Sequence, residues 1–210
     1  MKLLRYGPKG QEKPGLMDDS GQIAIVTSVT GIGVDSTNRY GIWLGDHATG
    51  LHLIVRCGNQ APGTAAGVNF DALTEPVLNG TGQVAFLASL VGSGVDDTNN
   101  DGIWATDATG SLRLIVRTGD MVEVGTNDFR MIDDLSMVLR HGSSDGRPSA
   151  FNDLGQLAFR ASFTDGSEGI LVSDLGAVPE PHSSALLAVG APLFLSWASR
   201  RRSPRSSRIT

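Results

Sequence analysis

The feature that most constrains the fold is an internal repeat with a long period. The segment Gly21–Ile25 (Gly-Gln-Ile-Ala-Ile) recurs as Gly82–Phe86 (Gly-Gln-Val-Ala-Phe) and as Gly155–Phe159 (Gly-Gln-Leu-Ala-Phe). The first spacing, from Gly21 to Gly82, is 61 residues, and the second, from Gly82 to Gly155, is 73 residues. Self-similarity at such a period is typical of architectures in which one supersecondary unit stacks on copies of itself. We therefore expect an array of related units.

Three further segments keep the offset of 61 residues. Gly31–Asn38 returns as Gly92–Asn99, Gly41–Trp43 as Gly102–Trp104, and Leu53–Arg56 as Leu114–Arg117. The third copy is shorter and carries Leu171 in place of the tryptophan, which suggests a terminal unit. We predict a remnant of a preceding repeat at 1–20, repeats at 21–81 and 82–154, an inserted loop at about 133–148 within the second, a short terminal repeat at 155–176, and a distinct C-terminal segment at 177–210.

Each unit reads as β-structure. Apolar residues alternate with others from Val84 to Leu90, and Asn79 and Gly82 supply a turn immediately before this run. We count about four strands per unit, the last and weakest near Phe70 or Phe129. The predicted fold class is therefore all-β, with tandem four-stranded repeats.

The tandem units resemble the propeller-like repeats that often precede a bacterial C-terminal sorting signal. Four strands in about 60 residues match one large propeller blade, whereas a closed ring typically needs about four blades or more. Two full units with fragments are too few for such a ring. The open alternatives are a partial propeller, a ring closed by oligomerisation and a β-sandwich.

The C-terminal segment has three parts in a fixed order. These are Val178-Pro179-Glu180-Pro181, an apolar run over 183–199, and the cluster Arg200-Arg201-Arg202. This arrangement resembles the PEP-CTERM sorting domain, which is read by membrane enzymes of the exosortase family. The resemblance covers about the last thirty residues, and implies export, membrane anchoring and cleavage near the Pro-Glu-Pro motif.

The physical properties of this tail agree with that resemblance. The 17 residues of 183–199 carry no charge and would form a helix of about 25 Å, the short limit for a transmembrane helix. Basic residues stay on the cytoplasmic side, so we expect an inner-membrane anchor with a cytoplasmic C-terminus, and a surface or extracellular location after processing.

Charge separates the tail from the rest of the chain. The tail holds five of the 17 basic residues and no acid after Glu180, so that 12 basic and all 22 acidic residues lie in 1–182. Such an acidic region argues against nucleic acid as a partner.

The start of the sequence resembles the inside of a repeat. Leu3-Leu4-Arg5 corresponds to Ile54-Val55-Arg56, so the first residues match a third strand. A membrane-sorted protein also needs a secretory signal, and residues 1–8 contain no apolar run as long as that of a signal peptide. We expect a longer N-terminus in the native protein or a truncated gene.

One loop has the pattern of a calcium ligand set. Asp97, Asn99 and Asp101 place oxygen side chains at alternate positions before Gly102, but the glutamate expected at the twelfth position is replaced by Ala108. The alternative is an Asx-rich hairpin loop without metal. No other cofactor is predicted.

Catalytic patterns are sparse. Gly142–Gly146 fits Gly-x-Ser-x-Gly around Ser144, yet lacks the expected strand and helix around it. Cys57 is the only cysteine, and its repeat counterparts are Tyr6 and Thr118, which disfavours catalysis.

Repetition itself suggests binding roles for two residue types. Arg56 and Arg117 end equivalent strands, and they either form a binding ring or are solvated arginines. Trp43 and Trp104 occupy equivalent positions, and they either pack in the structure or stack on sugars. We expect a non-catalytic exported surface or matrix protein that binds extracellular polysaccharide. The alternative is an exported hydrolase or lyase with its active site outside this sequence or on the inserted loop.

Overall fold

The computed structural model describes residues 2–6, 13–17, 21–137 and 150–175. The chain divides into two units, Met1–Gly176 and Ala177–Thr210, and the described residues all belong to the first. This unit is all-β, as predicted, and no helix occurs among its described residues. Within the same residues, no helix is long and apolar enough to cross a membrane. The helix predicted over 183–199 lies outside them.

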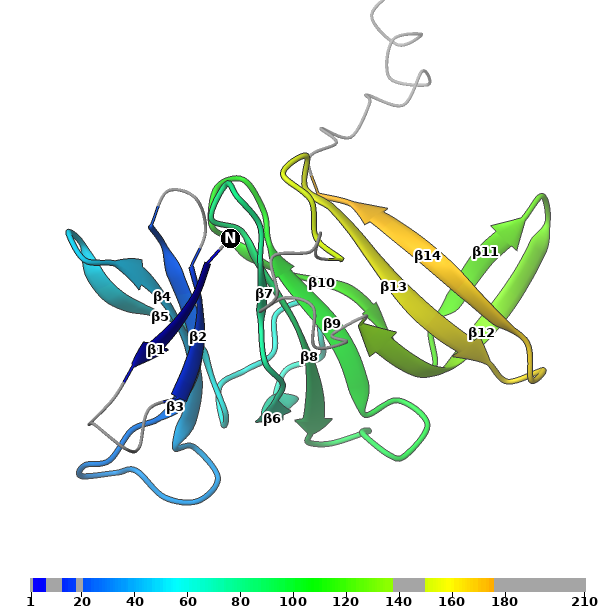
Figure 1. The fold of residues 1–210 in the computed structure, drawn as a ribbon. Helices are drawn as coiled ribbons and strands as arrows, with labels where there is room; N and C mark the ends of the chain where they lie inside the picture. The colour runs from blue at the N-terminus through cyan, green and yellow to red at the C-terminus, as the bar shows by residue number, and fades with distance from the viewer. Residues whose placement is uncertain (1, 7–12, 18–20, 138–149, 176–210) are drawn as a thin grey trace, which may run out of the picture. The chain divides into compact units, whose positions relative to one another are not determined.

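The described residues form fourteen strands in three antiparallel sheets (Figure 1). The first sheet has the order β1-β2-β3-β4-β5, with β1 at Lys2–Tyr6, β2 at Lys13–Met17, β3 at Ile23–Ser28, β4 at Tyr40–Asp46 and β5 at Gly50–Arg56. The second has the order β10-β9-β8-β6 with β7 also paired to β8, comprising β6 at Asn69–Leu73, β7 at Val77–Leu78, β8 at Val84–Val91, β9 at Asp101–Thr106 and β10 at Leu112–Arg117. The third has the order β11-β12-β13-β14, with β11 at Met121–Gly125, β12 at Asp128–Met137, β13 at Gln156–Phe163 and β14 at Glu168–Asp174.

The repeats correspond residue by residue in these sheets. Ile25 pairs with Trp43 in the first sheet, and Phe86 pairs with Trp104 in the second. Phe159 pairs with Leu171 in the third sheet, where the sequence lacks the tryptophan. The predicted turn before the central strand is also present in the second and third sheets. Asn79 Oδ1 accepts hydrogen bonds from the backbone N–H of Thr81 and Gln83, and Gly82 has a φ of 84°, which favours glycine.

Two boundaries predicted from the repeat are wrong. The strand near Phe70 was expected to end the first repeat, but β6 pairs with β8 and so begins the second sheet. The weak alternation around Phe70 could not show which neighbour the strand would join, because strand pairing is a tertiary choice. The predicted inserted loop at 133–148 also begins too early, since β12 continues to Met137 and pairs with β13 up to Phe159. Residues 138–149 lie outside the described part of the chain.

The second sheet has two apolar faces, and this determines how the neighbouring sheets pack on it. We call the face of the second sheet formed by Phe86, Trp104 and Leu114 its aromatic face, and the opposite face, formed by Ala85, Ile103 and Val116, its aliphatic face. In the first and third sheets, the same names denote the faces formed by the residues that are equivalent in the repeat.

The two cores join unlike faces of adjacent sheets. The aromatic face of the second sheet packs on Ala24, Ile42 and Val55, which form the aliphatic face of the first. The aliphatic face of the second sheet packs on the aromatic face of the third, which includes Phe159. The fully buried Trp104 indole lies edge-on to Phe70, with ring centroids 4.9 Å apart. Burial on both faces explains why β8 is apolar except for Ser89, and why the centre of β9 is the apolar run Ile103–Ala105.

Candidate functional site

A loop and an arginine form a repeated clamp at one end of the first two sheets. In the loop between β3 and β4, Asp35 Oδ1 accepts hydrogen bonds from the backbone N–H and hydroxyl of Thr37, at 2.8 and 2.6 Å. The Asn38 side chain closes the same loop, because its Oδ1 accepts from Asp35 N and its Nδ2 donates to Gly33 O. From the end of β5, the Arg56 guanidinium donates to Asn38 Oδ1 at 2.8 Å and to the Asn38 carbonyl oxygen.

The second repeat builds the same clamp. Arg117 donates to Asn99 Oδ1 at 2.8 Å and to the Asn99 carbonyl oxygen, while Thr98 donates to Asp96. These hydrogen bonds hold the pKa of Asp96 below its ordinary value, and the same pattern lowers the pKa of Asp35. The two arginines are thus half-buried loop anchors, which corrects both the binding-ring and the solvated-arginine interpretations.

The clamp bears directly on the predicted calcium ligands. Asn99 Oδ1 already accepts from Asp96 N–H and from the cationic Arg117, so it faces a positive charge. Asp101 begins β9, where burial and then the nearby negative charge of Asp134 raise the pKa of its carboxyl group. The described residues contain no group of three His, Cys, Asp or Glu side chains placed to hold a metal. The calcium site at Asp97, Asn99 and Asp101 therefore stays a prediction that this geometry does not favour.

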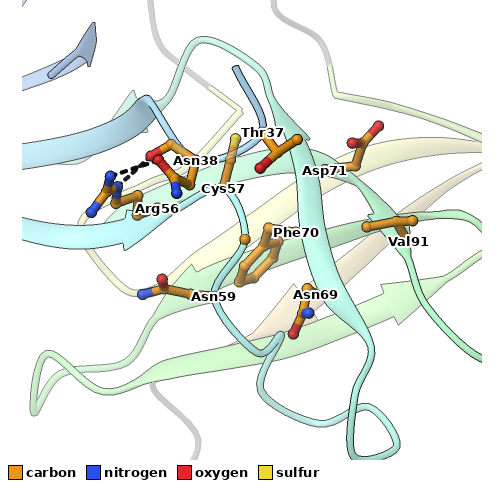
Figure 2. Close-up of a pocket in the computed structure, with 10 residues that line it drawn as sticks. Thr37, Asn38, Arg56, Cys57, Asn59, Asn69, Phe70, Asp71 and Val91 are labelled. Atoms are coloured by element: carbon orange, nitrogen blue, oxygen red, sulfur yellow. Dashed lines mark hydrogen bonds between the residues drawn. The ribbon is translucent and has the colours of Figure 1, made fainter. Parts of the chain in front are cut away.

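A cavity of about 480 Å³ opens beside the first clamp (Figure 2). Its lining comes from the loop after β3, the end of β5, strand β6 and the end of β8, so it lies where the first two sheets meet. The lining residues are Thr37, Asn38, Arg56, Cys57, Gly58, Asn59, Asn69, Phe70, Asp71 and Val91. Strand alternation buries Phe70 and leaves its two neighbours accessible.

Three polar groups of this cavity have unused hydrogen-bonding capacity. The side chains of Asn59, Asn69 and Asp71 make no hydrogen bond to any residue in the described part of the chain. Each amide offers two donors and an acceptor, and the carboxylate offers acceptors only. Together with the exposed Val91 they line one part of the cavity (Figure 2).

Cys57 adds no reactive group to the cavity. Burial raises the pKa of its thiol, with the charge of Asp71 as a second cause, so the thiolate is disfavoured. Its side chain is buried at the end of β5. This geometry agrees with the sequence argument that Cys57 is not a nucleophile.

A second cavity of about 430 Å³ lies at the turns that precede the central strands, and includes Gln83, Asp107 and Asp153. Its carboxylates are already engaged. Asp107 accepts hydrogen bonds from Thr109 and pairs with Arg113, and Asp153 accepts a hydrogen bond from Gly80 N–H. Both carboxylate oxygens of Asp107 are engaged, and Asp153 is engaged through one oxygen. The first cavity has three polar side chains without such partners among the described residues, so it is the better candidate site.

The tryptophans are not available to stack on sugars as a repeated pair. Trp104 is completely buried, and its Nε1 donates to the Pro62 carbonyl oxygen at 3.0 Å. Trp43 is half-buried. The sorting motif Val178–Pro181, the cluster Arg200–Arg202 and Ser144 all lie outside the described residues.

Sequence reasoning did not single out Asn59, Asn69 or Asp71. The available signal was the difference between repeats, since Met131 of the next unit occupies the strand position of Asn69. The strand register shifts between Phe70 and Ala72, where Asp71 lies. It shifts at the equivalent place between Ile132 and Asp134, where Asp133 lies. Asn69 has an amide where the equivalent Met131 has a thioether. This difference indicates that packing does not determine the residue type at this position.

The fold and this cavity define an all-β protein of tandem repeats with a polar site between two sheets. The chain belongs to a family of unknown function, DUF7453, whose profile matches residues 12–185.

Other similarities are short. Proteins named "Putative hydrolase" from Burkholderia orbicola (strain MC0-3) and Burkholderia cenocepacia (strain HI2424) are 74% identical to this chain over 23 residues. That match covers 11% of this chain and 8% of each relative, so the chain spans less than a tenth of the length of either. No solved structure matches the chain significantly.

Proposed function

We propose that this chain is a non-catalytic β-repeat protein that is displayed at the cell surface or released into the extracellular matrix, where it binds exopolysaccharide. The observation that carries this proposal is the three-part tail: Val178–Pro181, the apolar run 183–199 and Arg200–Arg202. In this proposal an exosortase-type enzyme recognises the tail while the 183–199 helix holds it in the inner membrane. The acidic residues before the tail then face away from the cytoplasm.

The sheets support a scaffold role. A four-stranded antiparallel meander such as β6-β8-β9-β10 has the strand arrangement of a propeller blade, and we infer that the three sheets are successive blades of an open propeller. In each clamp the repeated arginine holds a loop. The arginines therefore have a structural role, which explains their repetition without a catalytic one.

The cavity beside the first clamp supplies the binding site in this proposal. Asn59, Asn69 and Asp71 provide donors and acceptors for sugar hydroxyls, and Val91 provides a small apolar contact. A few directed polar groups around a partly apolar concavity are typical of small-ligand sites.

Sorting is tested in the native host with an epitope placed before the tail. Glu180→Ala in the full chain should prevent processing, seen as a retained higher mass on a gel and as retention in the inner membrane. A matched change in the same tail, Ser183→Ala, should process normally. Normal processing and release of the Glu180→Ala protein would refute the sorting proposal.

Binding is tested with the full chain in mild detergent on an array of bacterial polysaccharides. Asn69→Met, which installs the residue of the sister repeat, and Asp71→Ala should each reduce binding about tenfold or more, the loss expected for a directed polar contact. Asp133→Ala, at the equivalent position of the third sheet, is the control and should bind normally. Equal binding by all three variants would rule out this cavity, and turnover of a bound glycan that Ser144→Ala abolishes would favour the hydrolase alternative.

A further inference from the structure

One carboxylate carries the uncompensated charge of the cavity beside the first clamp. Asp71 is exposed on β6 and forms no hydrogen bond or ion pair with a described residue. Arg56 is the other charged residue of the lining, but its Nε and Nη2 already donate to Asn38. Figure 2 shows the two charged groups on opposite sides of the cavity, with the guanidinium turned toward Asn38. The charge that remains available to a ligand is therefore negative.

The electrostatic potential inside the cavity has the same sign. Burial raises the pKa of the Cys57 thiol, and the negative charge of Asp71 raises it further. Cys57 follows Arg56 directly in the sequence, and yet the charge that acts on its thiol is that of Asp71. A negative potential in a concave site favours a ligand group with a positive charge.

The arginines of the second and third sheets are used within the fold. They form ion pairs with acids of their own sheets, which are Arg113–Asp107, Arg130–Asp128 and Arg160–Glu168. Across 1–182 the sequence holds 12 basic and 22 acidic residues, so long-range electrostatics attract cationic polymers and repel anionic ones. This balance disfavours a glycan rich in carboxylate or sulfate groups.

The remaining groups of the lining suit the rest of a sugar ring. Asn59 and Asn69 each offer amide donors and an acceptor, which match hydroxyl groups. Val91 pairs with Asn69 between β6 and β8 and is 53% exposed, so it can contact the apolar C–H face of a ring. An ammonium group has donors only, and the carboxylate of Asp71 has acceptors only, so these two groups are complementary.

We infer that the cavity selects a glycan with free amino groups, such as a deacetylated amino-sugar polymer, and that Asp71 determines this choice. The inference rests on the proposed function, because it specifies the ligand class of the same cavity. A charge-assisted hydrogen bond would join the ammonium group to Asp71, while the two amides bind neighbouring hydroxyls. Because Asp71 is exposed to solvent, we expect the amino group to raise affinity by only about fivefold.

The test is calorimetric titration of the full chain in mild detergent with two β-1,4-linked tetrasaccharides. The tetramer of glucosamine and cellotetraose differ only in an amine or a hydroxyl at the second carbon of each ring. In a buffer in which the amine is protonated, the wild-type protein should bind the glucosamine tetramer about fivefold more tightly. Added salt should reduce this difference, because it screens the exposed charges.

Two matched variants separate the cavity from the general charge of the protein. Asp71→Asn keeps the size and polarity of the side chain, so it should bind cellotetraose as the wild type does and lose the preference for the glucosamine tetramer. Asp133→Asn removes the same charge at the equivalent position of the third sheet and should keep the preference.

The outcomes distinguish this inference from the proposed function. Equal binding of the two tetrasaccharides by the wild-type protein would overturn the inference and leave glycan binding by the cavity intact. A preference that survives Asp71→Asn, or that Asp133→Asn reduces equally, would also overturn it, because the general charge would then be the cause. Failure to bind either tetrasaccharide would refute it as well, and the polysaccharide array would then decide the proposed function separately.

Discussion

Arg56 and Asn38 are held together by two hydrogen bonds from one guanidinium, one to the Asn38 side-chain oxygen at 2.8 Å and one to its carbonyl oxygen. Arg117 and Asn99 repeat this arrangement in the second sheet. The planar guanidinium serves both acceptors at once, which a lysine ammonium cannot do in the same geometry. A pair 18 residues apart in sequence thereby ties the loop between β3 and β4 to the end of β5.

We expect Arg56→Lys to lower the free energy of unfolding by about 1–2 kcal/mol, because the two acceptors of Asn38 lose a shared donor. Arg117→Lys should cost a similar amount, since its partners are equivalent. Urea denaturation of both variants measures this. A loss in only one repeat, or in neither, would show that the clamp does not stabilise the loops.

The two tryptophans should respond differently to the same substitution. Trp104→Phe leaves the Pro62 carbonyl oxygen without its donor and opens space beside Phe70, so it should cost about 2–3 kcal/mol. Trp43→Phe removes an N–H that has no partner in the described residues, and should cost less than about 1 kcal/mol. Thermal and urea unfolding of both variants compare the two costs, and equal costs would contradict this account of the indoles.

Stability should fall in acid because of Asp107. The hydrogen bond from the Thr109 hydroxyl, followed by that from Arg113, lowers the pKa of Asp107 well below its ordinary value of 3.8. A carboxyl group with a lowered folded-state pKa stabilises the fold above its unfolded-state pKa, and this contribution is lost as the pH falls through the folded-state value. The free energy of unfolding should therefore decrease from about pH 4 downward.

Asp107→Asn should make that decrease shallower, because the substituted side chain has no proton to gain. Asp133→Asn serves as the control, since the Asp133 carboxylate accepts no hydrogen bond from a described residue. Urea titrations at a series of acidic pH values give the comparison. An unchanged pH dependence in Asp107→Asn would show that other carboxylates, such as Asp35 or Asp96, account for it.

Much of the local structure could be predicted from the repeat. The alternation in Val84–Leu90 predicts β8, and the turn residues before it adopt the expected hydrogen bonds and positive φ. The candidate site was not predicted, because Asn69 and Asp71 become neighbours of Arg56 only when β6 joins the second sheet beside the end of β5. The clamp was missed for the same reason, since Arg56 reaches Asn38 across a hairpin.

By itself, the sequence determined that this protein is an all-β array of related units, because alternation and turn chemistry act over a few residues and recur at a constant offset. Tertiary structure alone decided which sheet β6 joins and that both faces of the second sheet are buried. It also decided that Ile170 is exposed while its counterpart Ile103 is buried. The physical reason is that pairing and burial depend on the neighbour present at each sheet, and equivalent residues in successive repeats have different neighbours.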